Sequence, residues 1–374
     1  METIKLKING IEVTAPKGST ILEAARLAHI EIPTLCFLKE INEIGACRVC
    51  IVELKNGKLV TSCVYPAEDG MEVFTNTPKV MDSRKKTIQL LLSNHNRSCL
   101  SCVRSGHCEL QELARELGVE DEGYYDGETT PSEIDTSAAH MIRDNSKCIL
   151  CRRCVAVCSE VQGIGVIGAN NRGFATEIGS AFGMGLGETS CVSCGQCIAV
   201  CPTGALQEKD CTSEVFAAIA DPSKHVIVQT APAVRAALGE EFGLPIGTNV
   251  EGKMAAALRR LGFDRVFDTD FSADLTIMEE AHEFLDRVKN GGVLPMITSC
   301  SPGWVKYCEH YFPDMTENLS TCKSPQQMFG AIAKSYYAEK MGIDPEDIVS
   351  VSVMPCTAKK FEIGRDNQDA NGCP

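Results

Sequence analysis

Two cysteine-rich stretches, CILCRRCVAVC at 148–158 and CVSCGQCIAVCP at 191–202, decide how the middle of the chain folds. In each stretch two residues separate the first three cysteines from one another, and three residues precede the fourth. This spacing is typical of proteins that bind two [4Fe–4S] clusters, where the fourth cysteine of each run ligates the other cluster. The first run carries Ser159 where the second has Pro202. The predicted ligands are Cys148, Cys151, Cys154 and Cys201 for one cluster, and Cys191, Cys194, Cys197 and Cys158 for the other.

The 374 residues include 21 cysteines, and we interpret them as metal ligands and not as a disulfide scaffold. Disulfide scaffolds are usually short and secreted. The first residues alternate charged and apolar side chains, which predicts a strand and not a signal peptide, so we expect a cytoplasmic protein. The net charge of −14 argues against a nucleic-acid partner. No apolar run reaches the roughly 18 residues that a membrane span needs.

Residues 1–79 contain the first predicted cluster site. Two alternating runs at 3–8 and 11–14 flank Asn9-Gly10, which predicts a hairpin, and Thr20 and Glu23 form a capping box that predicts a short helix. Four cysteines follow with a spacing that suits a [2Fe–2S] cluster, although the first gap is longer than in plant ferredoxins. A structural zinc is the alternative. The predicted ligands are Cys36, Cys47, Cys50 and Cys63.

Residues 80–120 contain a second site, between helices expected at 85–92 and 108–117. One histidine and three cysteines in a short segment can fill four positions on a [4Fe–4S] cluster, and zinc is again the alternative. The predicted ligands are His95, Cys99, Cys102 and Cys108, whereas His107 is expected to be solvated. Residues 119–139 are acidic and lack apolar periodicity, which predicts a linker.

From residue 222 onward the pattern changes to alternating strands and helices. We expect strands at 225–229, 265–268, 293–298 and 348–354, and helices at 252–261 and 273–289. Such continuous apolar strands predict a parallel sheet buried on both faces, with ligands at the carboxyl ends of the strands. Cys211 lies outside every cysteine pattern and is expected to be a free core thiol.

The four cysteine sites and two later motifs together resemble the modular iron-only ([FeFe]) hydrogenases. The motifs are TSCSPGW at 298–304 and MPCTAKK at 354–360, with supporting stretches at 230–235, 273–280 and 323–327. The resemblance implies a multidomain α+β and α/β protein. Its expected parts are a β-grasp [2Fe–2S] ferredoxin-like domain (1–79), a small helical His-ligated [4Fe–4S] domain (80–120), a two-[4Fe–4S] ferredoxin domain (139–210) and the N-terminal part of the hydrogenase catalytic domain (222–374).

The resemblance also implies an H-cluster, in which a [4Fe–4S] cubane is joined to a two-iron unit that splits or forms H2. Its expected ligands here are Cys300 and Cys356, with Ser301 on the proton path and Lys359 donating to an iron-bound cyanide. Apolar packing around the two-iron unit is expected from Ala231, Pro232 and Met354. The rest of the proton path is expected from Glu280, Glu283, Arg287 and Ser320. Spacing alone would make the first three of these a solvated helix face.

The sequence departs from the family pattern in two places. The family commonly has two adjacent cysteines where this chain has Cys300-Ser301. The spacing to Cys356 puts Ser301 at the usual ligand position, but we take Cys300 as the ligand because a thiolate binds iron better than a hydroxyl does. The third family motif, which supplies the remaining cubane ligands, does not appear before Pro374, so we expect a truncated chain without full activity. The unassigned candidates for those ligands are Cys308, Cys322 and Cys373.

Two functions remain open from the sequence. The first is a hydrogenase that exchanges electrons with a ferredoxin or with a flavin- and iron–sulfur-bearing NAD(P)-linked subunit. The second is a non-catalytic electron-transfer subunit resembling those of complex I or formate dehydrogenase. The first 210 residues fit both, and the motifs at 298–304 and 354–360 favour the hydrogenase.

Overall fold

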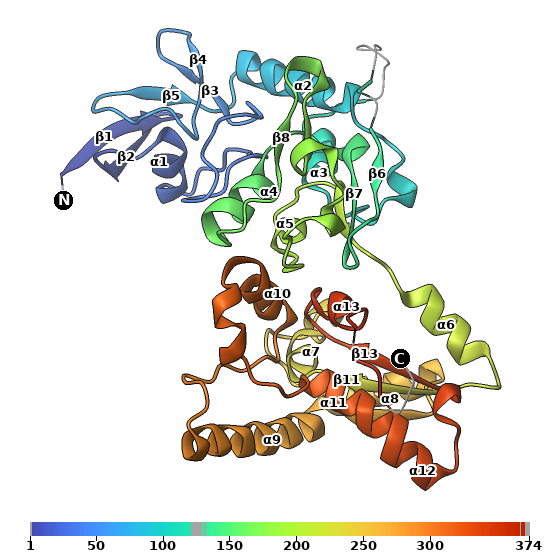
Figure 1. Cartoon of the computed structure of the whole chain (residues 1–374). Helices are drawn as coiled ribbons and strands as arrows, with labels where there is room; N and C mark the ends of the chain where they lie inside the picture. Colours follow the sequence, from blue (N-terminus) through green and yellow to red (C-terminus); the bar gives the residue numbers. More distant parts are fainter. Residues whose placement is uncertain (1, 121–128, 131, 367, 371–374) are drawn as a thin grey trace. The chain divides into compact units, whose positions relative to one another are not determined.

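The computed structural model describes residues 2–120, 129–130, 132–366 and 368–370. The chain divides into two compact units (Figure 1). Unit 1 comprises residues 1–189 and 196–207, and unit 2 comprises residues 190–195 and 208–374. Most of the linker predicted at 119–139 lies outside the described residues, but its last part forms strand β6 (Ile134–Asp135).

Unit 1 begins with the predicted hairpin. Strands β1 (Thr3–Ile8) and β2 (Ile11–Pro16) pair antiparallel around Asn9 and Gly10, whose φ angles of 51° and 83° suit a tight turn between twisted strands. The hairpin joins a five-stranded sheet in the order β2-β1-β5-β3-β4. The other strands are β3 (Ile51–Leu54), β4 (Leu59–Thr61) and β5 (Glu72–Phe74).

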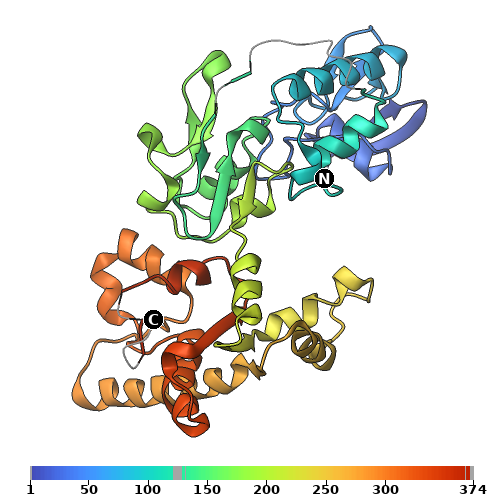
Figure 2. The same cartoon turned by 90° about the vertical axis from the view of Figure 1, so that its right-hand side faces the viewer.

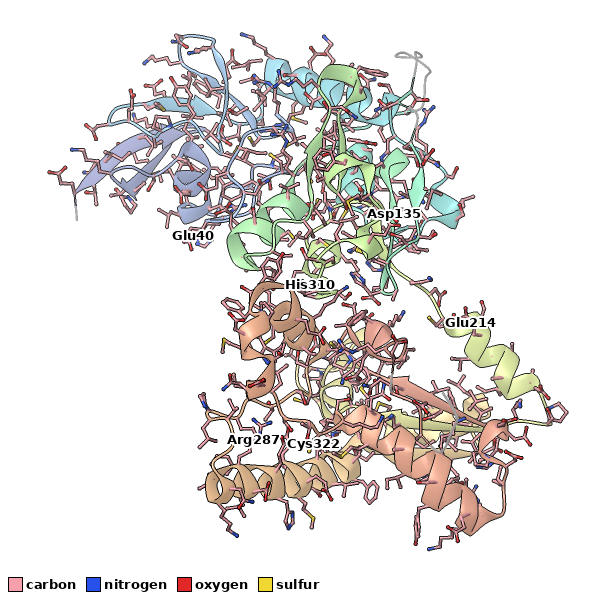
Figure 3. All side chains as sticks on the ribbon, viewed as in Figure 1. Glu40, Asp135, Glu214, Arg287, His310 and Cys322 are labelled. Atoms are coloured by element: carbon pink, nitrogen blue, oxygen red, sulfur yellow. The ribbon has the colours of Figure 1, made fainter. Side chains whose placement is uncertain are left out.

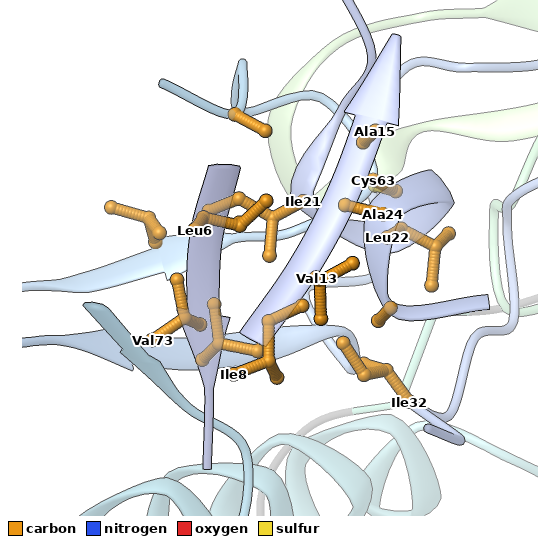
Figure 4. Packing of buried hydrophobic residues seen from close by; sticks show 14 of the residues in the cluster. Leu6, Ile8, Val13, Ala15, Ile21, Leu22, Ala24, Ile32, Cys63 and Val73 are labelled. Atoms are coloured by element: carbon orange, nitrogen blue, oxygen red, sulfur yellow. The ribbon is translucent and has the colours of Figure 1, made fainter. Parts of the chain in front are cut away.

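Helix α1 (Ile21–Leu27) packs on this sheet and closes the first core. Thr20 caps the helix as predicted, because its side chain accepts from the Glu23 N–H while Glu23 accepts from the Thr20 N–H. Leu22 and Ala25 are buried, whereas Leu27 is 57% exposed. The buried helical stripe runs through positions 21, 22, 24 and 25, and position 27 turns away from it. Figure 4 shows this core with Cys63 inside it.

The remainder of unit 1 consists of short elements around the cysteine loops. Helices α2 (Pro78–Ser93) and α3 (Glu109–Glu116) confirm the two helices expected before residue 120. Strands β6 and β7 (Met141–Asp144) form a sheet with β10 (Leu206–Glu208), and β8 (Gly168–Asn170) pairs with β9 (Glu177–Gly179). Helices α4 (Arg153–Ala156) and α5 (Gln196–Ala199) each contain the third cysteine of their run.

Unit 2 contains a parallel three-stranded sheet in the order β12-β11-β13. The strands β11 (His225–Thr230), β12 (Arg265–Asp268) and β13 (Ile348–Val353) confirm three of the four strands expected there. Alternate residues of β11 face opposite sides: Val226 and Val228 pack with Phe263, whereas Ile227 packs with Phe329. The central strand is therefore buried on both faces, as a parallel sheet requires.

The strand expected at 293–298 does not form. Only Ile297 makes an isolated parallel bridge, with Leu319, and Val293 and Leu294 are exposed. Pro295 has no N–H to donate to a neighbouring strand, so this apolar run stays a loop. As a result, Cys300 is placed by a loop and by the helix that follows it, and not by the end of a strand.

Helices surround the sheet of unit 2. Their bounds are α6 (Thr212–Ala220), α7 (Pro232–Ala237), α8 (Glu251–Leu261), α9 (Thr269–Asn290), α10 (Pro302–Tyr311), α11 (Pro325–Ile332), α12 (Ala338–Met341) and α13 (Lys359–Glu362). The long helix α9, orange in Figure 2, ends at Gly291 (φ 75°), as its sequence predicts. Within the described part of the chain, no helix is long and apolar enough to cross a membrane.

Candidate metal centres and catalytic loops

The four cysteines of the first predicted site are all buried in unit 1 and form two pairs. The sulfur atoms of Cys50 and Cys63 lie 3.2 Å apart. A hydrogen bond from Cys63 lowers the pKa of Cys50 to about 7, and one from Cys36 lowers the pKa of Cys47 to about 6. Each pair therefore has one thiol that readily becomes a thiolate, which is the form that binds iron.

Two cysteines of the second predicted site lie beside the loop that follows Cys201. Cys108 Sγ lies 3.7 Å from the Pro202 carbonyl oxygen, and Cys102 Sγ lies so close to Gly204 that a side chain there would meet it at 2.5 Å. His95 Nδ1 is buried without a hydrogen-bond partner among the described residues. Burial lowers the pKa of His95 and keeps its ring neutral, so a nitrogen lone pair is available for a metal. His107 is exposed, as expected.

The third predicted set lines a narrow cavity in unit 1. The set comprises Cys148, Cys151, Cys154 and Cys201, so the cavity joins the fourth cysteine of the second run to the first three of the first. Leu150 and Arg152 have left-handed backbone conformations (φ 54° and 61°) and turn the loop around the cavity. The Leu150 N–H points at Cys148 Sγ, 3.4 Å away.

Burial raises the pKa of the thiols around this cavity. The pKa of Cys148 rises to about 12 and that of Cys151 to about 11, while Cys154 lies well above its ordinary value. Thiols packed this densely become thiolates together only when positive charge such as iron enters between them. The donor set and the cavity therefore suit an iron–sulfur cluster. In the described ranges, no three His, Cys, Asp or Glu side chains converge closely enough to hold a single metal ion.

The fourth predicted set is divided between the two units. Cys158 and Cys197 are buried in unit 1, whereas Cys191 and Cys194 belong to unit 2. Ligation by this set stays a prediction. Cys211 is exposed at the start of α6, a helix with no buried residue, so the expectation of a core thiol is wrong.

In unit 2 a lysine joins the two motif loops. Lys359 Nζ donates to the Cys300 carbonyl oxygen at 3.0 Å, and its backbone N–H donates to the Cys356 carbonyl oxygen at 3.2 Å. The ammonium group also forms an ion pair with Glu362 at 2.9 Å. Glu362 is buried and receives a further hydrogen bond from Gln326. The loops that carry Cys300 and Cys356 are therefore held next to each other.

The residues expected to pack around a two-iron unit lie where β11 and β13 end. Thr230 pairs with Val353, so Ala231 and Met354 follow two neighbouring strand ends, and the Ala231 N–H donates to the Val353 carbonyl oxygen at 3.0 Å. Ala231 is buried, and Pro232 starts helix α7. This is the edge of a parallel sheet at which ligands bind.

A loop of the fourth cysteine set packs against the Cys356 loop. Thr357 Oγ1 donates to the Ser193 carbonyl oxygen at 2.7 Å. A side chain at Gly195 would meet Thr357 Oγ1 at 2.7 Å, so glycine allows the two loops to approach closely. Within unit 2, Ser193 and Gly195 therefore lie beside Thr357 of the motif at 354–360, and both are sequence neighbours of Cys194.

The predicted proton-path residues meet on one side of α9. Ser320 Oγ donates to Glu283 Oε2 at 2.8 Å, and Arg287 Nη2 pairs with Glu283 Oε1 at 2.6 Å. Cys322 Sγ lies 3.6 Å from Glu283 Oε2. In Figure 3 the labelled Cys322 lies close to α9, the helix that carries the labelled Arg287. Glu280 Oε1 is buried without a hydrogen-bond partner among the described residues. This part of α9 is therefore not a solvated face.

Burial and charge act in opposite directions on this cluster. Burial alone would raise the pKa of Glu283, but hydrogen bonds from Ser320, Arg287 and the Thr321 N–H outweigh it and lower that pKa. Burial and the charges of Glu283 and Glu280 raise the pKa of Cys322 and keep it a thiol. A carboxylate, a hydroxyl and a thiol are thus held within hydrogen-bonding reach of one another.

Two members of the site were missed in the sequence. Glu362 lies three residues after Lys359, a spacing that pairs side chains on a helix and could have indicated the ion pair. Cys322 was considered only as a cubane ligand, whereas its sulfur faces Glu283. Cys308 is buried within α10, where it lies 3.5 Å from the Phe312 carbonyl oxygen, and Cys373 lies outside the described residues.

Four known protein families match the chain in succession. Their descriptions are a 2Fe-2S iron-sulfur cluster binding domain (residues 1–78), an NADH-ubiquinone oxidoreductase-G iron-sulfur binding region (84–122), a 4Fe-4S dicluster domain (147–205) and an iron only hydrogenase large subunit, C-terminal domain (224–372). The chain therefore contains [2Fe–2S]- and [4Fe–4S]-binding domains, and the predicted multidomain α+β and α/β fold class is confirmed.

Among curated proteins, the chain is similar to the NADP-reducing hydrogenase subunit HndD of Solidesulfovibrio fructosivorans, with 53% identity over 100% of this chain and 66% of that protein. Iron hydrogenase 1 of Clostridium pasteurianum is 42% identical over 98% of this chain and 64% of that protein. A crystal structure of an NAD+-reducing [NiFe]-hydrogenase is 31% identical, with a TM-score of 0.52, over 56% of this chain and 88% of that one.

The chain thus spans about two thirds of the length of the curated relatives it matches. Its cysteine loops, its parallel sheet and its two motif loops follow one another in the order of the four matching families. The chain belongs to the iron-only ([FeFe]) hydrogenase family.

Proposed function

We propose that the protein is a hydrogenase that catalyses reversible H2 oxidation and proton reduction. The observation that carries this proposal is the double attachment of Lys359, which holds the Cys300 and Cys356 loops together at the ligand-binding edge of the sheet. Cys300 and Cys356 would supply two thiolates to the cubane of an H-cluster. When bound, that cluster supplies the iron at which H2 is split or formed.

Each side chain of the site has a separate task. Lys359 would supply a positive charge to the anionic ligands of the cluster, and the buried carboxylate of Glu362 holds the ammonium group in place. Ala231, Pro232 and Met354 would exclude water from the two-iron unit. Ser301 begins helix α10 directly after Cys300, so its hydroxyl is available to pass a proton.

Protons would move along the cluster of side chains on α9. Glu283 accepts from Ser320 and lies within reach of Cys322, so the three groups can exchange protons by small rotations. Glu280, one turn earlier on the helix, carries a buried carboxyl oxygen without a hydrogen-bond partner among the described residues and would extend this path toward Cys300. Arg287 fixes Glu283 in place.

Electrons would reach this site through one [2Fe–2S] and three [4Fe–4S] clusters. Their ligands would be the four sets predicted from the sequence, the last of which has a loop against the Cys356 loop. Because two similar proteins are named as NADP- and NAD+-reducing hydrogenases, we propose an NAD(P)-linked partner subunit. Such a partner would place the assembly in the cytoplasm.

The test is H2 evolution by the anaerobically matured protein that carries this sequence, with infrared spectroscopy for bound CO and CN. We expect H2 turnover and CO and CN bands from a form extended through the third family motif, and the loss of both when Cys356→Ala is introduced with the accessory clusters intact. An electron-transfer subunit without a catalytic site would show the accessory clusters in electron paramagnetic resonance (EPR) spectra, but neither turnover nor CO and CN bands.

A further inference from the structure

Helix α2 carries a positively charged side chain, Arg84, on its buried face, where apolar side chains are usual. Val80, Arg84 and Ile88 lie four residues apart on one helix face, and all three are buried, with Arg84 only 5% exposed. Four-residue spacing marks the stripe that a helix turns toward the core. Helix α2 packs this face against strand β3. An arginine at the centre of such a stripe therefore requires a reason other than packing.

The protein itself satisfies this guanidinium group only in part. Arg84 Nη2 donates to the Ile51 carbonyl oxygen at 2.7 Å, but Nε is buried without a hydrogen-bond partner among the described residues. No carboxylate of the described residues forms an ion pair with Arg84. A buried charge is costly unless another charge compensates it. The missing negative charge must therefore come from something other than an acidic side chain.

The hydrogen bond of Arg84 leads to the first predicted cysteine site. Ile51 directly follows Cys50, so the hydrogen bond from Arg84 ends one residue from a predicted cluster ligand. Burial lowers the pKa of Arg84 to about 10, and negative charge on Cys50 opposes this fall. Arginine at this pKa stays cationic at neutral pH. Arg84 also lines a groove that carries Glu112 and Glu116, but neither comes within ion-pair distance of it.

We propose that Arg84 is the electrostatic partner of the [2Fe–2S] cluster and raises its reduction potential. This inference rests on the [2Fe–2S] assignment in the proposed function. A [2Fe–2S] core held by four thiolates is an anion, and reduction adds one electron to it without forming or breaking a bond. A fixed buried cation stabilises the more negative, reduced form more than the oxidised form, and low local dielectric strengthens the effect. Arg84 acts through the cluster and touches no substrate.

The test compares three substitutions on α2 by EPR-monitored redox titration of the [2Fe–2S] signal, with dithionite as the electron source. Arg84→Gln removes the charge but keeps an N–H that can reach the Ile51 carbonyl, whereas Arg84→Lys keeps the charge. Lys86→Met is the matched control, because it removes a positive charge from an exposed position of the same helix. The [4Fe–4S] signals of the same samples provide an internal reference.

We expect Arg84→Gln to make the reduction equilibrium of the [2Fe–2S] cluster less favourable by about tenfold, which is 59 mV for a one-electron couple. Arg84→Lys should recover most of this difference, and Lys86→Met should leave the potential unchanged because water screens its charge. If Arg84→Gln binds no cluster while Arg84→Lys does, the need for the charge is also supported.

Two results would overturn the inference. The first is a wild-type potential in Arg84→Gln. The second is loss of the cluster in both Arg84 variants, which would assign the arginine to folding alone. Absence of a [2Fe–2S] signal from the wild-type protein would instead contradict the cofactor assignment in the proposed function, so the two failures are distinguishable.

Discussion

His95 illustrates how one partly buried side chain can support a predicted metal site. Its Nδ1 atom has no hydrogen-bond partner among the described residues, although unsatisfied buried polar atoms are rare in proteins. We expect His95→Cys to lower the reduction potential of one [4Fe–4S] cluster, because imidazole gives a higher potential than thiolate. The measurement is a redox titration of all clusters followed by EPR. His107→Cys, at an exposed position, is the control, and unchanged potentials in His95→Cys would contradict ligation by His95.

The adjacent residues Cys300 and Ser301 can be assigned by a pair of substitutions. Cys300→Ala should remove the catalytic cubane and lower the iron content by about four atoms per chain, because a hydroxyl is a poor iron ligand beside a thiolate. Ser301→Ala should keep the iron and slow H2 turnover. Iron analysis together with the turnover assay makes the distinction. Iron loss in Ser301→Ala but not in Cys300→Ala would show that Ser301 is the cubane ligand and that Cys300 lies on the proton path.

The sequence predicted the types of ligand better than their surroundings. Spacing alone indicated which cysteine joins the other run, and Cys201 does line the cavity with Cys148, Cys151 and Cys154. Spacing could not place Cys211, because burial depends on the partners of α6 and not on the cysteine itself. The contact between Cys322 and Glu283 could not be predicted from the sequence either, because the two residues are 39 positions apart and only the fold brings them together.

Glu283 and Arg287 connect helix α9 to the loop before α11. The Thr321 N–H donates to both oxygens of Glu283, and Arg287 donates to the Leu319 carbonyl oxygen at 2.7 Å. We expect Glu283→Gln to destabilise this connection by about 1–3 kcal/mol, the cost of an unsatisfied buried group. Hydrogen exchange at neutral pH should show faster exchange of the Thr321 and Cys322 amides. The exposed substitution Glu279→Gln on the same helix should leave their exchange unchanged.

The same connection should weaken in acid. The pKa of Glu283 is lowered in the folded protein, so its carboxylate stabilises the fold fully above the unfolded pKa of about 4.5. The stabilisation is lost as the pH falls from there through the lower, folded pKa. Exchange of the Thr321 amide, corrected for the intrinsic pH dependence, should therefore accelerate below about pH 4.5 in the wild type but not in Glu283→Gln. Equal pH profiles would show that another group controls the loop.

The strands of unit 2 show which elements can be inferred from local pattern. Residues 225–230 are apolar at positions 226–228 and form the central strand β11, which neighbours cover on both faces. Residues 293–298 are equally apolar but include Pro295, and only one isolated bridge forms. Apolar content indicates burial, whereas a strand also needs N–H groups and a free neighbouring edge. The prediction at 293–298 considered only the first of these conditions.

At the scale of the whole molecule, the compact units do not coincide with the cysteine runs. Residues 190–195 belong to unit 2, although residues on both sides belong to unit 1. Thr357 holds this segment through Ser193, and Gly195 allows the close approach. The second run therefore contributes to both units. A boundary drawn from cysteine spacing alone, as at 139–210, could not indicate this division, because the contacts that cause it come from residues far along the chain.

The total iron content tests all the accessory sites at once. One [2Fe–2S] and three [4Fe–4S] clusters correspond to about 14 iron atoms per chain, whereas a zinc protein or a single cluster would hold about four or fewer.

The thiols around the cavity in unit 1 have raised pKa values, so iron must displace their protons when it binds. The free energy of iron binding therefore adds to the stability of the folded protein. Removing the iron with an anaerobic chelator should therefore lower the unfolding temperature of the protein. Cys201→Ala should reduce the iron content by about four atoms and weaken this stabilisation, while Cys211→Ala, at an exposed thiol outside every ligand set, should change neither. Iron and sulfide analysis with thermal unfolding of the loaded and stripped forms provides the measurement. Equal unfolding temperatures of the two forms would mean that the cysteine loops fold without the clusters they are proposed to bind.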